Sequence, residues 1–471
     1  MLILSGVGLS LLLAFVVHFY FLFSNSHQLF QWRHQLFEHL EFHMDHWTFE
    51  AGEKVNLYVS NSSKDTVRLK LYSPLRRDSM LVEEGFQASF QKVSQRPAVH
   101  GTNWQASFSF HLPNNISSGW YVIELSNQTF TKRSSIFIAP PPHSIQKEVA
   151  IIFSTNTWNA YNHWGGQSFY SRNHTPVISF DRPQLLADPF LDNTYPNHQF
   201  YFQGANRDLH LAELLDSAEI AFDAYSMTEL EKGDPRLAQY STLIFSTHTE
   251  YWSWNMLHHL NRCLDSGVSA LFLAGNVAVY VTEFDSTFRQ ISIHPTRAKH
   301  SLFQIADTAG IRPFGTEYSY YGFQSYAPYQ VQNDSSWVWE GVDVKEGDLL
   351  GEISEAYDYT PMYDHWWQNL WGLRKRGQYG AASGLEIDKV YPGTPDNWVH
   401  LASGLNPLDA NGQGAVYPDP SYNWQVGNGA DMGYYLHPGG GIVFHASSMA
   451  FTGALPHDGR LRKLVINLIR K

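Results

Sequence analysis

The stretch STHTEYWSWNM, residues 246–256, places acid–base and metal-binding side chains directly after a short apolar run. His248 and Glu250 are two positions apart, so their side chains point to the same side of an extended backbone. One could then bind a metal ion while the other transfers a proton. The same residues also allow a plainer interpretation, in which Glu250 interacts with the positive N-terminus of a helix beginning after Ser253 and His248 is an ordinary loop residue.

A second polar and aromatic stretch, NTWNAYNHWGGQSFY at residues 156–170, also follows an apolar run, VAIIFST at 149–155. The stretch around His248 follows the similar run STLIFST at 241–247. In an α/β sheet the functional crevice lies beyond the carboxyl ends of the strands. We therefore expect both stretches to border one site.

Other chemical signals in the sequence are weaker. SGLEID, residues 383–388, supplies Glu386 and Asp388, which taken alone are typical of solvated loop carboxylates. The sequence contains no G-x-S-x-G elbow, no phosphate-binding loop ending in Lys-Ser/Thr and no H-E-x-x-H motif. The single cysteine, Cys263, lies in a predicted helix and is interpreted as a small buried residue.

The elements that must position these residues alternate between strands and helices. Ser253 is the expected N-cap of the helix that follows the His248 stretch, and Gly267 is its expected end. Residues 148–471 are therefore predicted to form an α/β domain with a doubly wound, mostly parallel sheet. The near-continuous apolar runs typical of parallel strands covered on both faces lie at 149–155, 241–247 and 268–275.

A different pattern precedes this domain. Apolar and polar residues alternate at period two in several short runs between turn-forming residues, which predicts an all-β, immunoglobulin-like sandwich over residues 47–140. The runs are KVNLYVS, VRLKLYS, QASFSFHLP and GWYVIELS. IAPPPHS, residues 138–144, predicts a stiff linker, because consecutive prolines favour polyproline II.

The N-terminus predicts export. Residues 1–26 begin with 23 uncharged, mostly apolar residues, long enough to form a transmembrane helix or a long signal peptide, and residues 27–46 are expected to be a connector. We therefore expect a membrane-anchored or secreted protein. Five glycosylation sequons support export only weakly, at Asn61, Asn115, Asn127, Asn173 and Asn333.

Composition limits the classes of partner. The 471 residues carry a formal net charge of −12 with 43% hydrophobic and 15% aromatic residues, so the chain is a folded protein of two or three domains. An acidic chain without a Lys/Arg cluster repels a phosphate backbone, so nucleic acid is not an expected partner.

Several long motifs, in order along the chain, resemble the large (β) subunit-like family of N,N-dimethylformamidase. The resemblance covers roughly residues 45–470 and implies the same order of β-sandwich and C-terminal α/β domain, the latter expected to be glutamine-amidotransferase-like. The motifs are ISSGWYVIEL, TWNAYNHWGGQSFY, HTEYWS, LFLAGN, GLEID and GADMGYYLHPGGGIVFHASSMAFTGALPHDG.

This resemblance implies a mononuclear iron held by two tyrosines and a glutamate, with a histidine and a second glutamate as catalytic groups. By motif, the ligands are Glu250, Tyr161 and a second tyrosine, assigned to Tyr121 with Tyr170 as the alternative. Tyr121 could reach the metal only if the sandwich packs over the strand ends. By the same motifs, the catalytic groups are His248 and Glu386.

The implied chemistry is hydrolysis of a carboxamide or formamide C–N bond. Phenolate and carboxylate oxygens suit Fe(III), which would act as a Lewis acid. The implied partners are a small-molecule amide, a small subunit or a homo-oligomer, and a membrane if residues 1–26 are retained. The competing hypothesis is a non-catalytic, anchored or secreted protein that keeps the fold and binds a ligand or carbohydrate.

Overall fold

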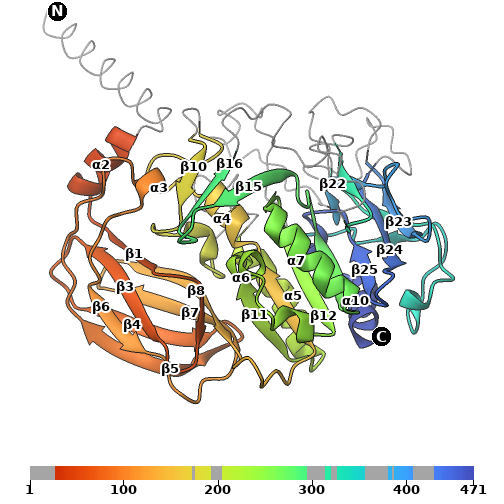
Figure 1. Cartoon of the computed structure of the whole chain (residues 1–471), viewed down its shortest axis with the longest axis horizontal. Coiled ribbons are helices and arrows are strands. Elements are labelled where there is room, and N and C mark those ends of the chain that lie inside the picture. Colours follow the sequence, from red (N-terminus) through yellow and green to blue (C-terminus); the bar gives the residue numbers. More distant parts are fainter. Residues whose placement is uncertain are drawn as a thin grey trace, which may run out of the picture.

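The computed structural model of the chain is β-rich, with mixed sheets and few helices (Figure 1). The predicted signal or anchor, residues 1–26, lies outside the described part of the chain. Within that part, no helix is long and apolar enough to cross a membrane. The structure describes residues 27–171, 175–191, 204–293, 313–319, 326–355, 380–383, 387–406 and 429–471.

Two sheets pack together in the N-terminal part of the chain, where alternate apolar side chains of both sheets share one core. Strand β1 (Leu40–Met44) lies within the predicted connector, which also contains helix α2 (His27–Leu36). The alternation of buried Leu40, Phe42 and Met44 is too short to have been recognised as a strand. The other strands are β2 (Thr48–Glu50), β3 (Lys54–Asn61), β4 (Val67–Ser73), β5 (Arg76–Phe86), β6 (Phe108–His111), β7 (Gly119–Ser126) and β8 (Thr131–Ala139).

The sequons lie mainly in this part. Asn61 is only 1% exposed, and its side-chain oxygen accepts a hydrogen bond of 3.1 Å from Asn127. A glycan on Asn61 would have to displace these contacts, so this sequon does not support the export prediction.

A nine-stranded sheet organises the remainder of the chain. Its first five strands are mutually parallel and its last four are joined by antiparallel pairings. In spatial order they are β11 (Phe222–Ser226), β9 (Val149–Phe153), β12 (Thr242–His248), β14 (Ser269–Gly275), β25 (Ile442–His445), β24 (Asp431–Leu436), β23 (Val399–Gly404), β19 (Tyr329–Val331) and β20 (Leu349–Leu350). The prediction of a mostly parallel sheet is therefore right only for the first five strands.

Both faces of the parallel strands are covered. Ile151 and Ile152, adjacent on β9, belong to different hydrophobic clusters because successive side chains of a strand point to opposite faces. Helices α5 (Ala205–Ser217) and α10 (Gly459–Arg470) contribute to the cluster of Ile151, whereas α6 (Met227–Lys232) and α7 (Trp254–Asp265) contribute to that of Ile152. Figure 1 shows α7 lying along this sheet.

Short elements complete the described fold. Two of them, α4 and β13, lie directly after the carboxyl ends of β9 and β12 and so border the expected site. The helices are α3 (Pro97–His100), α4 (Thr155–Tyr161) and α9 (Phe451–Ala454); the strands are β10 (Val177–Ser179), β13 (Tyr251–Trp252), β15 (Tyr280–Phe284), β16 (Gln290–Ile293), β17 (Glu317–Ser319), β18 (Tyr326–Ala327), β21 (Ala382–Ser383) and β22 (Ile387–Lys389).

Helix α7 has the predicted ends. The Ser253 hydroxyl accepts a hydrogen bond of 3.0 Å from the Met256 amide, and Gly267 adopts φ +94° just beyond the helix. Cys263 is 5% exposed, and burial raises the pKa of its thiol to about 11. Its interpretation as a buried apolar residue is confirmed, because a protonated thiol is a poor nucleophile.

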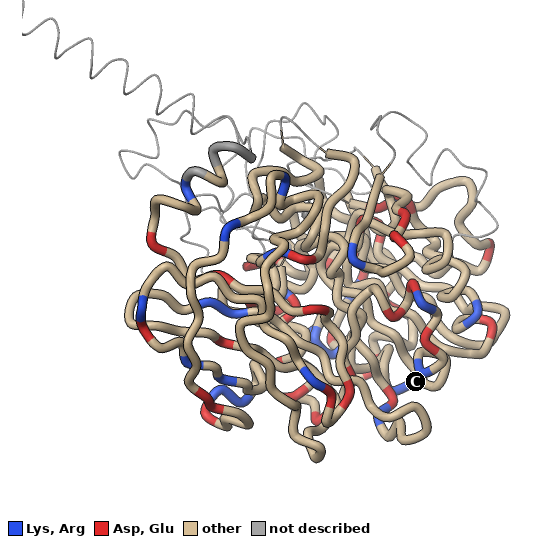
Figure 2. Tube along the Cα trace, turned by 60° about the vertical axis from the view of Figure 1, so that its left-hand side comes forward, with Lys and Arg blue, Asp and Glu red and all other residues tan. Residues whose placement is uncertain are grey.

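The N-terminal sheets pack against the nine-stranded sheet through aromatic rings and ion pairs. Trp120 and Phe137 lie 4.8 and 4.6 Å from Phe153 between ring centroids. Arg236 forms an ion pair with Glu50 at 2.7 Å across the same junction. Along the backbone trace in Figure 2, Lys and Arg are scattered among Asp and Glu.

Candidate active site at the strand ends

The candidate site lies at the edge where the neighbouring strands β12, β14 and β25 end. Four of the seven described non-glycine residues with positive φ lie at this edge: Thr247 (63°), Asn276 (58°), Ala278 (50°) and Ser447 (62°). Such conformations cost energy and concentrate at functional sites. Backbone strain therefore marks the same edge as the chemically active side chains.

Glu250 is the centre of the site. Its carboxylate accepts a hydrogen bond of 2.9 Å from the Tyr161 hydroxyl. The Tyr170 hydroxyl lies 2.7 Å from Oε1 and 2.9 Å from Oε2 of the same carboxylate. Tyr251 donates in turn to the Tyr170 oxygen at 2.6 Å, and the Glu250 amide donates to the Thr157 hydroxyl at 3.1 Å. Glu250 is 2% exposed, so this carboxylate is held by phenol groups rather than by water.

His248 lies beside the same carboxylate. Its Nε2 is 3.4 Å from Glu250 Oε2 and 3.0 Å from the side-chain nitrogen of Asn276. Burial, opposed by the charge of Glu250, lowers the pKa of the fully buried imidazole to about 4. His248 is therefore neutral at pH 7 in this environment, the state in which an imidazole can accept a proton.

The two stretches identified in the sequence meet as expected. Tyr161 ends α4 and Tyr170 follows in the loop after it, while His248 ends β12 and Glu250 precedes β13. The rings of Tyr161 and Tyr170 stack with their centroids 4.1 Å apart, which directs both hydroxyls to one carboxylate. A parallel sheet brings together loops that are about 90 residues apart in the sequence.

Tyr121 does not lie at this cluster, and its assignment as the second tyrosine is corrected. On β7, Trp120 faces the nine-stranded sheet and contacts Phe153, so the next side chain turns to the opposite side. Tyr121 accordingly packs in the core between the N-terminal sheets, where its hydroxyl donates to the Ser117 carbonyl at 2.8 Å. Tyr170, the alternative, contacts Glu250 instead.

Of the two carboxylates in SGLEID, Glu386 lies outside the described residues. Asp388 is described on β22 and is 0% exposed, so its interpretation as a solvated loop carboxylate is wrong. Its Oδ2 accepts a hydrogen bond of 3.3 Å from the Val277 amide, next to the Asn276 that contacts His248. Asp388 therefore lies at this edge of the sheet.

The alternative role of Glu250, at the N-terminus of α7, belongs to a different glutamate. Glu231 accepts hydrogen bonds from the Ser253 hydroxyl and, at 3.0 Å, from Asn255. Glu250 instead contacts the tyrosines and His248. Tyr251 and Asn276 were not singled out from the sequence, although each stands inside a motif quoted above.

Arg182 supports the loop between the two tyrosines and was not recognised in the sequence. It is 0% exposed, and its guanidinium donates to the carbonyl oxygens of Asn159 (2.8 Å), Asn162 (3.0 Å), Trp164 (2.8 Å) and Gln167 (3.1 Å). Burial lowers the pKa of Arg182 to about 9, so it stays charged at pH 7. The planar fork of one arginine thus fixes the backbone that carries both phenol groups.

Arg182→Lys is expected to lower the free energy of unfolding by about 2 kcal/mol, because an ammonium group cannot satisfy this fan of carbonyl oxygens. Urea unfolding followed by far-ultraviolet circular dichroism measures the loss. Arg262→Lys, at an exposed position of α7, is the control and should change stability by less than about 0.5 kcal/mol. Equal stability of the two variants would contradict the supporting role of Arg182.

The donor set fits the implied iron. Tyr161 and Tyr170 present phenol oxygens within hydrogen-bonding distance of the carboxylate of Glu250, which is 2% exposed. These hard oxygen donors suit Fe(III), and loss of the two phenol protons would provide charge to balance a trivalent ion. His248 at 3.4 Å from Glu250 would then lie next to the metal ligands.

Comparisons with known proteins agree with these motifs. Residues 73–462 match the family described as N,N-dimethylformamidase beta subunit-like, C-terminal. The N,N-dimethylformamidase beta subunits of Alcaligenes sp. and Paracoccus aminophilus are each 22% identical to this chain, over 78% of it and 54% of their own length. The chain thus spans about half the length of these relatives. Among solved structures, an FMN-binding beta-glucuronidase from Facaelibacterium prausnitzii L2-6 is 6% identical, over 50% of this chain and 27% of the glucuronidase chain. Its TM-score of 0.17 is too low to support an argument about the fold.

Proposed function

Because the chain belongs to the N,N-dimethylformamidase beta subunit-like, C-terminal family, we propose that it is an iron-dependent amidohydrolase acting on a carboxamide or formamide C–N bond. Family membership supports the amidohydrolase relationship, and the site geometry supports the specific chemistry. The products would be a carboxylic acid and an amine.

The single observation that carries the proposal is the convergence of Tyr161, Tyr170 and His248 on the carboxylate of Glu250. A carboxylate that only stabilised the fold could be satisfied by one hydrogen bond or by a helix N-terminus. Two stacked phenols directed at one buried carboxylate form a set of oxygen donors, with an imidazole at its side. Iron, when bound, would supply a Lewis acid for the amide carbonyl.

The protein's own residues would then handle position and protons. Arg182 holds the loop that carries Tyr161 and Tyr170, so the donors are in place before a substrate enters. His248, neutral because burial lowers its pKa to about 4, could accept a proton at one ring nitrogen and pass it to the leaving amine. Glu386, outside the described residues, is proposed as the carboxylate that takes the proton of the attacking water.

The wider assignments belong to the same proposal. Helices on both faces of the parallel strands support a doubly wound, glutamine-amidotransferase-like domain. The two packed N-terminal sheets support an immunoglobulin-like sandwich. The relatives are named as beta subunits, which implies a partner subunit for them and supports a small subunit or homo-oligomer here. The N-terminal 26 residues support an anchored or secreted location. The net charge of −12 favours small amides over nucleic acids as the substrate class.

Iron analysis combined with an amide panel tests the proposal. The purified full chain, alone and after anaerobic loading with Fe(II) followed by air, is expected to contain about one iron and to show a visible phenolate-to-Fe(III) absorption band. The loaded chain should release amine from at least one member of a panel of formamides, acetamides and aryl carboxamides. Removal of the iron by a chelator should abolish the release, and reloading should restore it.

Two outcomes would contradict the proposal. A folded chain that takes up no iron has no phenolate–iron site, which favours a ligand-binding protein that keeps the fold. A chain that binds iron and shows the visible band, but hydrolyses no member of the panel even when prepared as an oligomer, is not an amidohydrolase of this class.

A further inference from the structure

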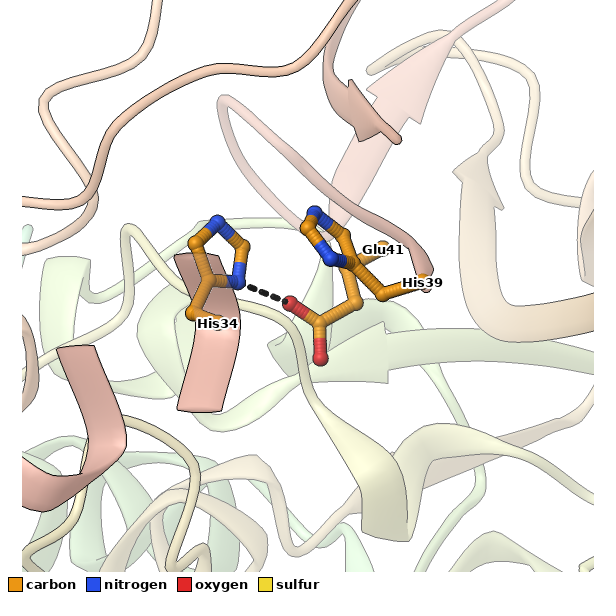
Figure 3. Close-up of side chains that lie close together, drawn as sticks. All are labelled: His34, His39 and Glu41. Carbon is orange, nitrogen blue, oxygen red and sulfur yellow. Dashed lines mark ion pairs between the residues drawn. The ribbon is translucent and has the colours of Figure 1, made fainter. Parts of the chain in front are cut away.

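A second cluster of metal-binding side chains lies outside the candidate active site, between helix α2 and strand β1. His34 belongs to α2, Glu41 to β1, and His39 to the short connection between them. One ligand atom from each residue lies within 4.8 Å of the other two. Figure 3 shows the three side chains grouped together, with His34 directed at the Glu41 carboxylate.

Backbone carbonyl groups fix which ring nitrogens are available. Nε2 of His34 lies 3.1 Å from the Gln91 carbonyl oxygen, and Nδ1 of His39 lies 3.0 Å from the Phe37 carbonyl oxygen. A carbonyl can only accept, so these two nitrogens carry the protons. Donation from the second nitrogen to a carbonyl is the usual arrangement of a histidine that binds a metal, and it leaves a lone pair on the other nitrogen.

The remaining nitrogen of His34 faces a carboxylate. Nδ1 of His34 lies 3.2 Å from Oε2 of Glu41. This oxygen is shielded from solvent, and its contact with His34 is an ion pair when Nδ1 carries a proton. A lone pair opposed to a carboxylate oxygen is repulsive unless a proton or a cation lies between them.

The third ligand atom requires only a small adjustment. Nε2 of His39 lies 2.9 Å from the hydroxyl of Ser60, a side chain that could rotate and contribute a fourth oxygen. Ligand atoms around a tetrahedral zinc ion lie about 3.3 Å apart, given bonds of about 2.0 Å, so ligand atoms that lie within 4.8 Å of one another need to approach by about 1.5 Å at most to complete the site.

Aromatic rings pack around His34, which is 6% exposed. Phe90, Trp104 and Trp164 lie 5.5, 5.8 and 6.3 Å from the His34 ring between centroids, and His34 and His39 stack at 4.0 Å. Apolar surroundings strengthen the attraction between a cation and its ligands. Trp164 belongs to the loop between Tyr161 and Tyr170, so the cluster touches the same loop that Arg182 holds.

We propose that His34, His39 and Glu41 form a binding site for a divalent, zinc-class metal ion that joins helix α2 to strand β1. Two imidazoles and one carboxylate are a ligand set suited to zinc and its neighbours among the transition metals, and differ from the tyrosine-rich set at Glu250. The site is independent of the proposed iron centre, since it shares no residue with it.

Zinc titration of the full chain carrying Glu250→Gln tests the proposal without interference from the iron site. Competition against a chromophoric zinc indicator is expected to show one tight site. His34→Asn and Glu41→Gln should each weaken zinc binding by at least about 100-fold, since loss of an outer-shell partner alone costs about 10- to 100-fold. Cobalt(II) in place of zinc should give the intense visible bands of a four-coordinate ion.

His46→Asn is the matched control, because His46 also pairs with a glutamate, Glu53, at 3.1 Å but lies outside the cluster. It should leave zinc affinity unchanged. Equal zinc affinity of the His34→Asn and His46→Asn chains, or no zinc binding by the parent chain, would overturn the proposal. If the cluster variants fail to fold, X-ray absorption of zinc in the parent chain decides the matter: two imidazole ligands support the site and none overturns it.

Discussion

Replacing Glu250 by glutamine is expected to weaken iron binding by more than about 100-fold and to abolish amide hydrolysis. Glutamine keeps the shape of the side chain and one acceptor oxygen for the phenols that donate at 2.7 and 2.9 Å. It removes the negative charge on which a buried oxygen-donor set depends. Metal analysis after loading, the visible absorption band and amine release measure the three consequences separately.

Glu231→Gln is the matched control for this prediction. Glu231 is also buried and also accepts two side-chain hydrogen bonds, but it contacts the N-terminus of α7 rather than the tyrosines. This control should lose some stability and keep its iron and its activity. If the Glu250→Gln chain retains stoichiometric iron, the metal site lies elsewhere.

The strands that deliver the site could be predicted because their signal is local. Near-continuous apolar runs at 149–155 and 241–247 became the parallel strands β9 and β12, and polar residues immediately after each run stand at the site. The start of helix α7 at Ser253 and its end at Gly267 could also be predicted, since capping depends on a few neighbouring residues. The meeting of His248 and Glu250 agreed with the spacing, although Thr247, near the end of β12, has a φ of 63°.

What the sequence could not reveal depends on packing between distant segments. The strands β19, β20 and β23 are short and arise from Tyr-, Gly- and Asp-rich sequence, so their antiparallel addition to the sheet had no periodic signal. Arg182 follows an unremarkable turn, and only the folded loop reveals that four carbonyl oxygens surround it. Buried polar roles of this kind are set by tertiary contacts rather than by motifs.

The choice between Tyr121 and Tyr170 illustrates the same limit. Both tyrosines stood in motifs that resemble the family, so the resemblance could not distinguish them. The distinction follows from strand geometry, since β7 must direct Trp120 and Tyr121 to opposite faces. With Trp120 against Phe153, Tyr121 can only enter the core of the N-terminal sheets.

Tyr170→Phe and Tyr121→Phe, which remove the same atom from each tyrosine, are therefore expected to differ sharply. Tyr170→Phe removes a hydroxyl that contacts both oxygens of Glu250 and accepts from Tyr251, so the visible iron band should weaken and kcat/KM should fall by at least about 100-fold. Tyr121→Phe removes one hydrogen bond to the Ser117 carbonyl, costing about 1 kcal/mol of stability, with the iron band and kcat/KM unchanged.

Absorption spectra and steady-state kinetics of the two iron-loaded variants, with urea unfolding beside them, separate a ligand from a structural tyrosine. The reverse result, loss of the band in Tyr121→Phe alone, would require β7 to turn its opposite face to the strand ends. Trp120 would then have to leave Phe153, because adjacent side chains of one strand cannot face the same sheet. A spectrum of the Tyr121→Phe chain therefore tests the packing of the N-terminal sheets as well as the identity of the second tyrosine.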